Sequence, residues 1–283
     1  MNAGNSDQAE FWTTDAGLKW VAQQAALDAL FQSVLDGTLD RADLHPGDKV
    51  LDVGCGTGAS TLHAAKGVGP SGFVLGADIS PTMLERARDR SAGAANVDFL
   101  MADVAEHPFE QGKFDQMVSR FGVMFFADPT AAFANIHNAL KHNGKVTFAT
   151  WGQIPNNPWF TCAAQAAKAH LGSPPPVDPD APGPFSMRNV DVVVRILANA
   201  GFERIAAETV DMYLTPHGTP AEVAALAISI GPAARTLSHF NGTDGDFAAV
   251  AARLETAFEP FASSQGVRIP AEINFFQAHC KAA

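Results

Sequence analysis

The run from Val50 to Gly58 constrains the fold more than any other part of the chain. It reads VLDVGCGTG: an apolar run, an aspartate at position 52, and glycines at alternate positions. A helical pattern follows directly, from Ala59 to Lys66. Glycine permits positive φ and lets a ligand approach the backbone, and the N–H groups at a helix start are free to donate. The run therefore predicts a buried parallel strand, a ligand-binding turn and the start of a helix.

Two classes of ligand fit such a turn. A dinucleotide site has the spacing G-x-G-x-x-G and an acidic residue about 20 residues later that binds a ribose. Here the spacing is G-x-G-x-G, over Gly54, Gly56 and Gly58, and Asp52 lies two residues before the first glycine. An acid at that point suits a ligand with an ammonium group and is unfavourable beside a pyrophosphate. Asp78 ends the next apolar run, 20 residues after Gly58, and suits the ribose of either ligand.

Composition narrows the function classes. The 283-residue chain is 47% apolar and carries a formal net charge of −11, with a pI of about 5.1. This balance disfavours phosphate-rich partners, so no nucleic-acid partner is expected. The N-terminus lacks the pattern of a signal peptide, and no apolar run reaches the ~18 residues of a membrane span. We expect a cytoplasmic protein without membrane insertion, either a monomer or a homodimer.

Strands and helices alternate after residue 46, which is typical of a parallel sheet covered on both faces. Two irregular or alanine-rich stretches interrupt this order and are expected to form a helical cap. Seven strands are predicted, at 49–53, 73–78, 97–101, 114–119, 145–150, 205–214 and 273–280. The predicted segments are an N-terminal helical lid at 1–45, a cofactor-binding half at 46–151, a cap insertion at 152–188, and the rest of the sheet at 189–283 with a helical insertion at 219–262.

The glycine run resembles motif I of the class I S-adenosylmethionine-dependent methyltransferases. The order of the predicted strands is similar to that family over roughly residues 40–283. The resemblance implies an α/β, Rossmann-like sheet of seven mostly parallel strands, in the order 3-2-1-4-5-7-6 with strand seven antiparallel, and helical cap insertions. It also implies S-adenosyl-L-methionine as the cofactor and S-adenosyl-L-homocysteine as the product.

In this fold the cofactor lies at the carboxyl ends of the strands. The resemblance places its methionine and ribose portions on the glycine turn, with Asp52 toward the amino group. It assigns the two ribose hydroxyls to Asp78, the adenine ring to Ile79 and the adenine amino group to Asp103. The residues expected to bind the cofactor are Asp52, Gly54, Cys55, Gly56, Gly58, Asp78, Ile79, Ala102, Asp103, Val104 and Ser119.

The loop after strand four, residues 119–126, faces the acceptor in this family. It resembles the loop of small-molecule methyltransferases of the ubiquinone and menaquinone-biosynthesis type. Metal-dependent catechol-type enzymes have acidic residues where this chain has Ser119-Arg120 and Thr150-Trp151, so no metal is expected. Arg120 would either hold a carboxylate of the acceptor or pair with a nearby acid. The residues expected to bind the acceptor are Trp12, Trp20, Arg120, Phe121, Met124, Trp151 and Trp159.

The leading hypothesis is methyl transfer to oxygen or carbon of a small, largely apolar acceptor, by direct displacement. No histidine lies in a recognisable motif, and the catalytic residues are unknown; His217 and His239, in the cap region, are the candidates for a general base. Two alternatives stay open. One is an NAD-dependent oxidoreductase, which the glycine spacing disfavours. The other is a non-catalytic, cofactor-binding regulatory protein, which no sequence feature excludes.

Overall fold

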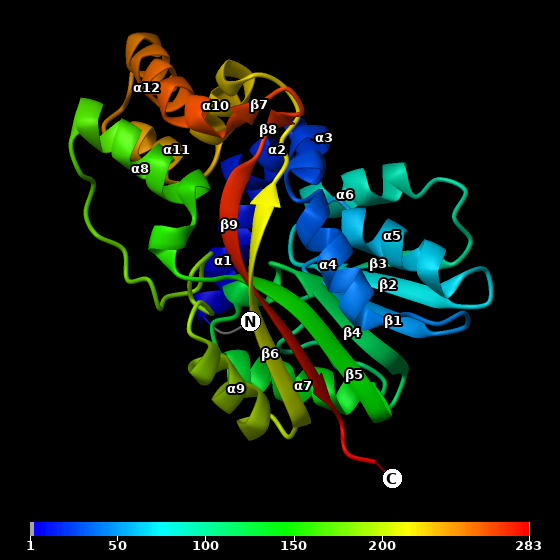
Figure 1. Cartoon of the computed structure of the whole chain (residues 1–283). Helices are drawn as coiled ribbons and strands as arrows, with labels where there is room; N and C mark the ends of the chain where they lie inside the picture. Colours follow the sequence, from blue (N-terminus) through cyan, green and yellow to red (C-terminus); the bar gives the residue numbers. More distant parts are fainter. Residues whose placement is uncertain (1–2, 283) are drawn as a thin grey trace.

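A seven-stranded sheet with the order β3-β2-β1-β4-β5-β9-β6 forms the centre of the molecule (Figure 1). The computed structural model describes the backbone of residues 3–282 and the side chains of residues 8–14 and 16–282. The predicted lid (1–45) and the predicted last segment (189–283) include residues 1–2 and 283, which lie outside the described part. The strands are β1 (Lys49–Val53), β2 (Phe73–Asp78), β3 (Val97–Met101), β4 (Phe114–Arg120), β5 (Leu140–Trp151), β6 (Glu203–Leu214) and β9 (Ile269–His279). Strand β9, the seventh strand of this sheet along the chain, is antiparallel to both of its neighbours. The predicted strand order and the predicted antiparallel strand are both confirmed.

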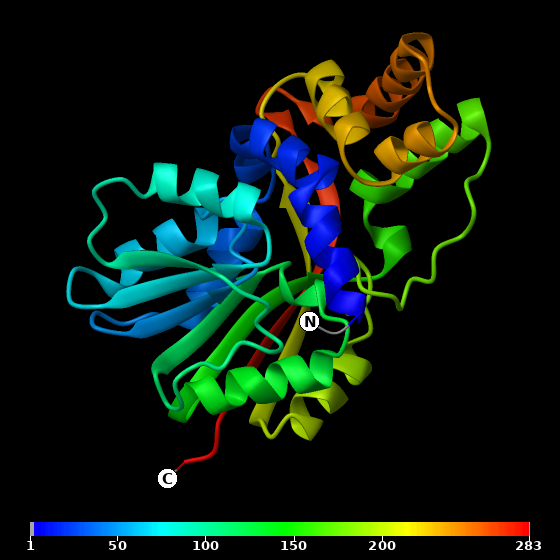
Figure 2. The same ribbon diagram turned by 180° about the vertical axis from the view of Figure 1, so that it is seen from behind.

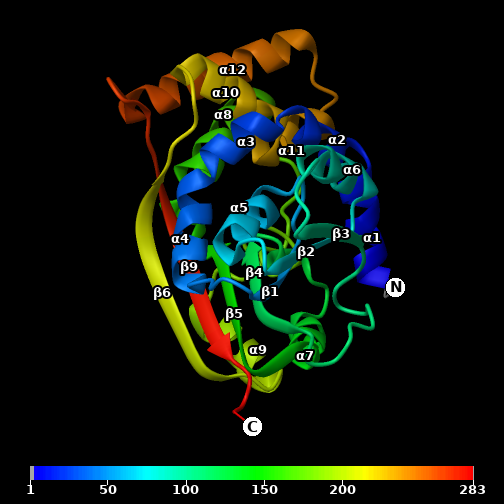
Figure 3. The ribbon, with the colours of Figure 1, turned by 90° about the vertical axis from the view of Figure 1, so that its right-hand side faces the viewer.

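Helices cover both faces of the sheet. One face carries α4 (Gln32–Ala42), α5 (Ala59–Val68) and α6 (Pro81–Arg90), and the other carries α7 (Pro129–Ala139) and α9 (Val190–Asn199). In Figure 3, α7 and α9 lie together on the side of the sheet away from α5. Four of the five residues of β1 are buried, as expected for a strand covered on both sides. This burial explains why β1 reads as an apolar run and not as an alternation.

Two helices begin at a polar residue followed by proline, Ser80-Pro81 and Asp128-Pro129. The Ser80 hydroxyl accepts a hydrogen bond from the Met83 N–H, and the Asp128 carboxylate accepts one from the Ala131 N–H at 3.0 Å. In both helices proline occupies the first turn, where its missing N–H costs nothing. Ser80 thereby fixes the chain directly after β2, at the edge where a ligand is expected.

The N-terminal segment, predicted as a helical lid over residues 1–45, is helical in the structure. It forms four short helices: α1 (Ala3–Thr13), α2 (Asp15–Ala22), α3 (Gln24–Leu30) and α4. Only the first three lie across the carboxyl edge of the sheet, between its cofactor half and the cap (Figure 2). We call α1–α3 the lid. Helix α4 instead packs on the sheet against β4 and β5, so the lid ends earlier than the predicted residue 45.

The two insertions, far apart in the sequence, pack together as one helical cap (Figure 1). The first supplies α8 (Pro158–Leu171), and the second supplies α10 (Pro220–Ser229), α11 (Gly231–His239) and α12 (Asp244–Phe258). Helix α8 packs against α11 and α12. A small hairpin, β7 (Ala262–Ser263) and β8 (Gly266–Val267), then leads into β9, which starts before the predicted residue 273.

Candidate functional site

The glycine turn after β1 has positive φ at Gly54, Gly56 and Gly58, but for different reasons. A Cβ on Gly54 would lie 2.5 Å from the Gly122 Cα, so this glycine lets the turn and the loop after β4 pack closely. A Cβ on Gly58 would crowd α6 and β3. A Cβ on Gly56 would meet only the Met83 Sδ at 3.7 Å. The middle glycine therefore leaves open space on the ligand side of the turn.

Asp78 is held in a fixed orientation at the carboxyl end of β2. Its Oδ2 accepts a hydrogen bond from the Gly56 N–H at 2.8 Å, and its Oδ1 accepts one from the Ser80 N–H at 2.9 Å. Burial raises the pKa of Asp78, and these backbone donors oppose the rise. An ionised carboxylate has further acceptor sites on both oxygens. Asp78 can therefore accept hydrogen bonds from a diol in addition to the two that it forms.

Asp52 is fully buried on β1, and only one of its oxygens is satisfied. Its Oδ2 accepts hydrogen bonds from the Ser60 and Thr61 hydroxyls of α5, both at 2.6 Å. Its Oδ1 has no partner among the described residues. Burial raises the pKa of Asp52 to about 6, against the opposing effect of the two hydroxyls. A buried acceptor without a donor is costly, so this oxygen has the capacity for one more hydrogen-bond donor.

Aromatic rings from the lid and from the loop after β4 face the glycine turn across one cavity. The Trp12 indole stands edge-on to Phe125, with ring centroids 5.1 Å apart, and Phe31 stands edge-on to Phe121 at 5.5 Å. The Trp12 carbonyl accepts a hydrogen bond from the Ser80 hydroxyl at 2.7 Å, which ties the lid to the start of α6. We call this surface the aromatic wall; it comprises Trp12, Trp20, Phe31, Phe121, Phe125 and Phe126.

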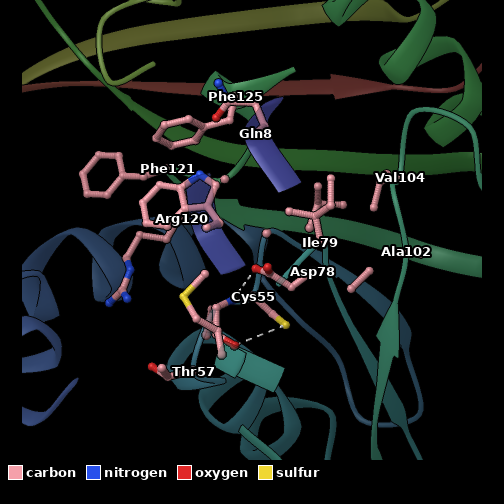
Figure 4. A pocket seen from close by; sticks show the side chains of 18 of the residues that line it. Gln8, Cys55, Thr57, Asp78, Ile79, Ala102, Val104, Arg120, Phe121 and Phe125 are labelled. Carbon is pink, nitrogen blue, oxygen red and sulfur yellow. Dashed lines mark hydrogen bonds between the residues drawn. The ribbon is translucent and has the colours of Figure 1, made fainter. Parts of the chain in front are cut away.

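Most of the predicted cofactor residues line this cavity, opposite the aromatic wall (Figure 4). Those that line it are Gly54, Cys55, Gly56, Asp78, Ile79, Ala102, Asp103 and Val104. Asp52, Gly58 and Ser119 lie behind the lining. The Ser119 hydroxyl donates to the Val53 carbonyl at 2.7 Å and accepts from the Gly122 N–H at 3.1 Å. Its position indicates that it holds the loop after β4 in place and does not face a ligand.

Four of the predicted acceptor residues line the cavity: Trp12, Trp20, Arg120 and Phe121. The other three do not. Met124 is buried in the core, Trp151 stacks behind Phe121, and Trp159 stacks on Phe258 within the cap. For these three, packing explains the side chain, and their expected contact with the acceptor is not seen.

The two candidate bases also lie elsewhere. His217 is exposed in the loop before α10, and His239 is exposed at the end of α11 beside Phe240. Neither belongs to the lining of the cavity. The structure therefore brings neither histidine into this cavity, and the catalytic residues stay unassigned.

Several residues of the site were not identified from the sequence. Gln8 of α1 lines the cavity, and its Oε1 is closed to solvent and has no partner in the described part of the chain. It lies in a polar N-terminal stretch that shows no motif. Phe31 also lines the cavity, although its helical spacing favours a core position. Ser60 and Thr61 could have been identified, because hydroxyls in the first turn of α5 are well placed to reach Asp52.

Comparison with known proteins identifies the part of the chain that holds the glycine turn. Residues 50–144 match the model of a methyltransferase domain. The aklanonic acid methyltransferase DauC of Streptomyces sp. (strain C5) is 36% identical over 106 residues, 37% of this chain and 48% of that protein. The demethylmenaquinone methyltransferase of Staphylococcus aureus is 39% identical over 114 residues, 40% of this chain and 47% of that protein. The match thus covers about half the length of each curated relative.

A solved structure extends the likeness to the whole fold. The phosphoethanolamine N-methyltransferase 2 of Haemonchus contortus, in complex with phosphomonomethylethanolamine and S-adenosylhomocysteine, superposes with a TM-score of 0.59 at 21% identity. The superposition covers 95% of this chain and 58% of that one. No group of three or more His, Cys, Asp or Glu in residues 3–282 is arranged as a metal site. Within the same residues, no helix is both long and apolar enough to cross a membrane.

The cofactor that this fold implies, S-adenosylmethionine, fits the residues present. The open side of Gly56 admits a ligand against the backbone, the Asp78 carboxylate is oriented to accept a diol, and the buried Asp52 carboxylate lies directly behind the glycine turn. These three features follow one another along the edge of β1 and β2. Residues 50–144 therefore match a methyltransferase domain, and the chain has the fold of the class I S-adenosylmethionine-dependent methyltransferases.

Proposed function

We propose that the protein is an S-adenosylmethionine-dependent methyltransferase that acts on oxygen or carbon of a small, largely apolar acceptor. The observation that carries the proposal is the two-sided cavity. One side presents the glycine turn and Asp78, and the other is the aromatic wall. Pockets for small molecules are mostly apolar with a few placed polar groups, which this division matches.

The chain's own residues would position the two substrates and exclude water. When bound, S-adenosylmethionine supplies an electrophilic methyl group on a sulfonium. Asp78 orients the ribose, the glycine turn accommodates the chain beyond it, and the aromatic wall holds the acceptor on the opposite side. Alignment of the attacking atom with the methyl and sulfur would supply much of the acceleration by direct displacement. The lid, tied to α6 through the hydrogen bond from the Ser80 hydroxyl to the Trp12 carbonyl, limits solvent access.

The lining also restricts the chemistry of the acceptor. No histidine lines the cavity within the described residues, and Asp78 and Asp103 lie on the cofactor side. An acceptor that ionises easily, such as a phenol or an enolisable carbon acid, needs the least help from a base. The two curated relatives are named for aklanonic acid and demethylmenaquinone. We propose an acceptor of the same quinone or polyketide type.

Two measurements test the function. Isothermal titration calorimetry with S-adenosylmethionine, S-adenosylhomocysteine and NADH should show binding of the first two ligands and none of NADH. Binding of NADH alone would support the oxidoreductase alternative. Release of S-adenosylhomocysteine should then be measured with a panel of phenols, hydroquinones, β-dicarbonyl compounds, amines and thiols. Tight cofactor binding without turnover on any acceptor would favour the regulatory alternative.

A further inference from the structure

The Ser80 hydroxyl joins the cofactor half of the chain to the lid. Ser80 is fully buried between β2 and α6. Its hydroxyl accepts a hydrogen bond from the Met83 N–H at 3.3 Å and donates one to the Trp12 carbonyl at 2.7 Å. A hydroxyl has one donor and two acceptor sites, so serine can form both bonds at once. The first bond caps α6, and the second serves only the lid.

The Trp12 carbonyl lies where α1 ends and α2 begins, and we call residues 12–17 the lid elbow. Carbonyl groups in the last turn of a helix lack intrahelical donors and need a partner from elsewhere, which Ser80 supplies here. The helices on either side of the elbow carry Trp12 and Trp20, whose rings stand edge-on with centroids 5.7 Å apart. Both residues line the cavity. A contact that fixes the elbow therefore fixes both indoles of the aromatic wall.

Gly17 of α2 leaves the space that this contact needs. A Cβ at this position would overlap the Trp12 carbonyl oxygen and would lie 3.4 Å from the Ser80 Oγ. A larger residue would therefore push the carbonyl away from the hydroxyl. Glycine within a helix is less favourable than alanine, because it loses more conformational freedom on folding. Close packing at the elbow accounts for a glycine that α2 itself does not favour.

The main chain of Ser80 serves the cofactor side of the cavity. Its N–H donates to the Asp78 Oδ1 at 2.9 Å, so one residue holds Asp78 with its backbone and the lid with its side chain. Replacing the side chain removes the lid contact and leaves the backbone N–H in place. Ser80 itself does not line the cavity. Helices α2 and α6 lie side by side (Figure 3), which brings the elbow and the end of β2 together.

We propose that Ser80 is a positioning residue for the acceptor, which acts through the Trp12 carbonyl to set the place of the two indoles opposite the glycine turn. The proposal rests on the proposed function, because it takes the aromatic wall as the surface that binds the acceptor. It adds that the position of this surface is set from the cofactor half of the chain. Acceptor affinity can therefore be lost while the cofactor site stays intact.

Two substitutions break the contact from opposite sides. Ser80→Ala removes the hydroxyl, and Gly17→Ala displaces the carbonyl. The acceptor probe is 1-naphthol, an apolar phenol, whose Kd is measured by equilibrium dialysis against protein saturated with S-adenosylhomocysteine. In both variants this Kd should rise about threefold to tenfold, as expected for the loss of one hydrogen bond. The Kd of S-adenosylhomocysteine by calorimetry should stay within about twofold of the wild type, since the backbone bond to Asp78 remains.

Gly17→Ala is the sharper test, because alanine favours a helix more than glycine does. Weaker 1-naphthol binding in this variant cannot then arise from a less stable α2. As controls, Asp128→Ala removes the equivalent cap from α7, in which the carboxylate accepts from the Ala131 N–H. Thr82→Val removes a longer hydrogen bond from α6 to the lid, from the Thr82 hydroxyl to the Thr13 carbonyl at 3.5 Å. Both controls should bind 1-naphthol within about twofold of the wild type.

Hydrogen exchange of the ligand-free protein, followed by mass spectrometry, reports on the elbow without any ligand. Residues 8–22 should exchange faster in Ser80→Ala and Gly17→Ala than in the wild type and in Thr82→Val. Unchanged exchange there, or an unchanged Kd for 1-naphthol in both variants, would overturn the positioning role. An equal loss of S-adenosylhomocysteine affinity would also overturn it, because Ser80 would then act on the cofactor.

The outcomes for the wild type separate this proposal from the proposed function. If the wild type bound no S-adenosylhomocysteine, the proposed function would be wrong, whereas exchange at residues 8–22 would still show whether Ser80 fixes the lid. Binding of S-adenosylhomocysteine but not of 1-naphthol would contradict an acceptor site on the aromatic wall, and with it the positioning role, while leaving cofactor binding intact.

Discussion

The rings of Phe121 and Trp151 are stacked, with centroids 4.6 Å apart and planes 3° apart. Phe121 has a φ of +68°, a backbone conformation that residues other than glycine rarely adopt. Such strain persists where the surroundings impose it, and it is concentrated at functional sites. Here the strained backbone presents the Phe121 ring to the cavity, and Trp151 at the end of β5 supports the ring from behind.

Replacing Phe121 with leucine should therefore weaken acceptor binding. The variant keeps an apolar side chain but loses the stacked pair, which is worth about 0.5–1.5 kcal/mol beyond burial. We expect the KM for the acceptor to rise about threefold to tenfold, with the affinity for S-adenosylhomocysteine within threefold of the wild type. Steady-state kinetics and calorimetry measure the two effects. The reverse result, weaker cofactor binding with an unchanged KM, would place Phe121 on the cofactor.

Asp78→Asn should weaken cofactor binding with the fold intact. The amide keeps the shape of the carboxylate but loses the charge that strengthens hydrogen bonds from ribose hydroxyls, each worth ~1.5–3 kcal/mol. We expect at least a tenfold rise in the Kd of S-adenosylmethionine by calorimetry. Asp98→Asn, at an exposed carboxylate on the neighbouring strand β3, is the control and should bind normally. Unchanged affinity in Asp78→Asn would falsify the ribose assignment.

The cofactor half was predictable because its signals are local. The glycine spacing, the acid at the end of β2 and the Ser80-Pro81 helix start are each readable within a few residues. They lie at consecutive strand ends, and parallel strands bring these ends to one edge without any further information. Asp52 is an instructive case, because its position in the motif was readable but its unpartnered oxygen depends on Ser60 and Thr61 of the next helix.

The acceptor side was less predictable because it depends on how separate segments meet. Phe121 and Met124 lie three residues apart in one loop, yet the first faces the cavity and the second faces the core. The positive φ at Phe121 and the short helix η1 (Val123–Phe125) set this difference. Trp151 ends β5 and Trp159 lies in the first turn of α8, yet neither side chain lines the cavity. The periodicity of the sequence does not predict which of these side chains face the cavity.

Trp12 of the lid and Trp159 of the cap should respond differently to replacement by alanine. Trp12→Ala removes part of the aromatic wall, so we expect a higher KM for the acceptor. Trp159→Ala leaves a void beside Phe258, and loss of a buried tryptophan costs about 3–5 kcal/mol of folding free energy. Thermal unfolding followed by circular dichroism should show a clear fall in Tm for Trp159→Ala only. A raised KM in a stable Trp159→Ala variant would bring the cap back into the acceptor site.

Chelation should leave methyl transfer unchanged. The positions at which metal-dependent relatives carry acids hold Ser119-Arg120 and Thr150-Trp151, which offer no carboxylate. Moreover, the Thr150 hydroxyl is buried and donates to the Met187 carbonyl at 3.2 Å. Release of S-adenosylhomocysteine should proceed at the same rate after dialysis against EDTA. Loss of turnover on chelation, with recovery on adding Mg²⁺, would overturn this expectation.

The burial of Asp52 should make stability and cofactor affinity respond to pH in opposite directions. Burial raises its pKa from 3.8 to about 6, so the folded state favours the protonated carboxyl. Its contribution to stability is therefore greatest below pH ~4 and is lost as the pH rises to about 6, a difference on the order of 3 kcal/mol. An ammonium ligand prefers the ionised form, so affinity for S-adenosylhomocysteine should rise over the same range.

Asp52→Asn separates the two effects. The amide oxygen can still accept from Ser60 and Thr61, while the buried charge is gone. In the ligand-free protein, urea denaturation should show the variant to be more stable than the wild type at pH 8, with a smaller difference at pH 5. Calorimetry should show weaker S-adenosylhomocysteine binding that no longer rises between pH 5 and pH 8. Burial also raises the pKa of Asp78, so a rise that persists in Asp52→Asn would assign the pH dependence to Asp78 instead.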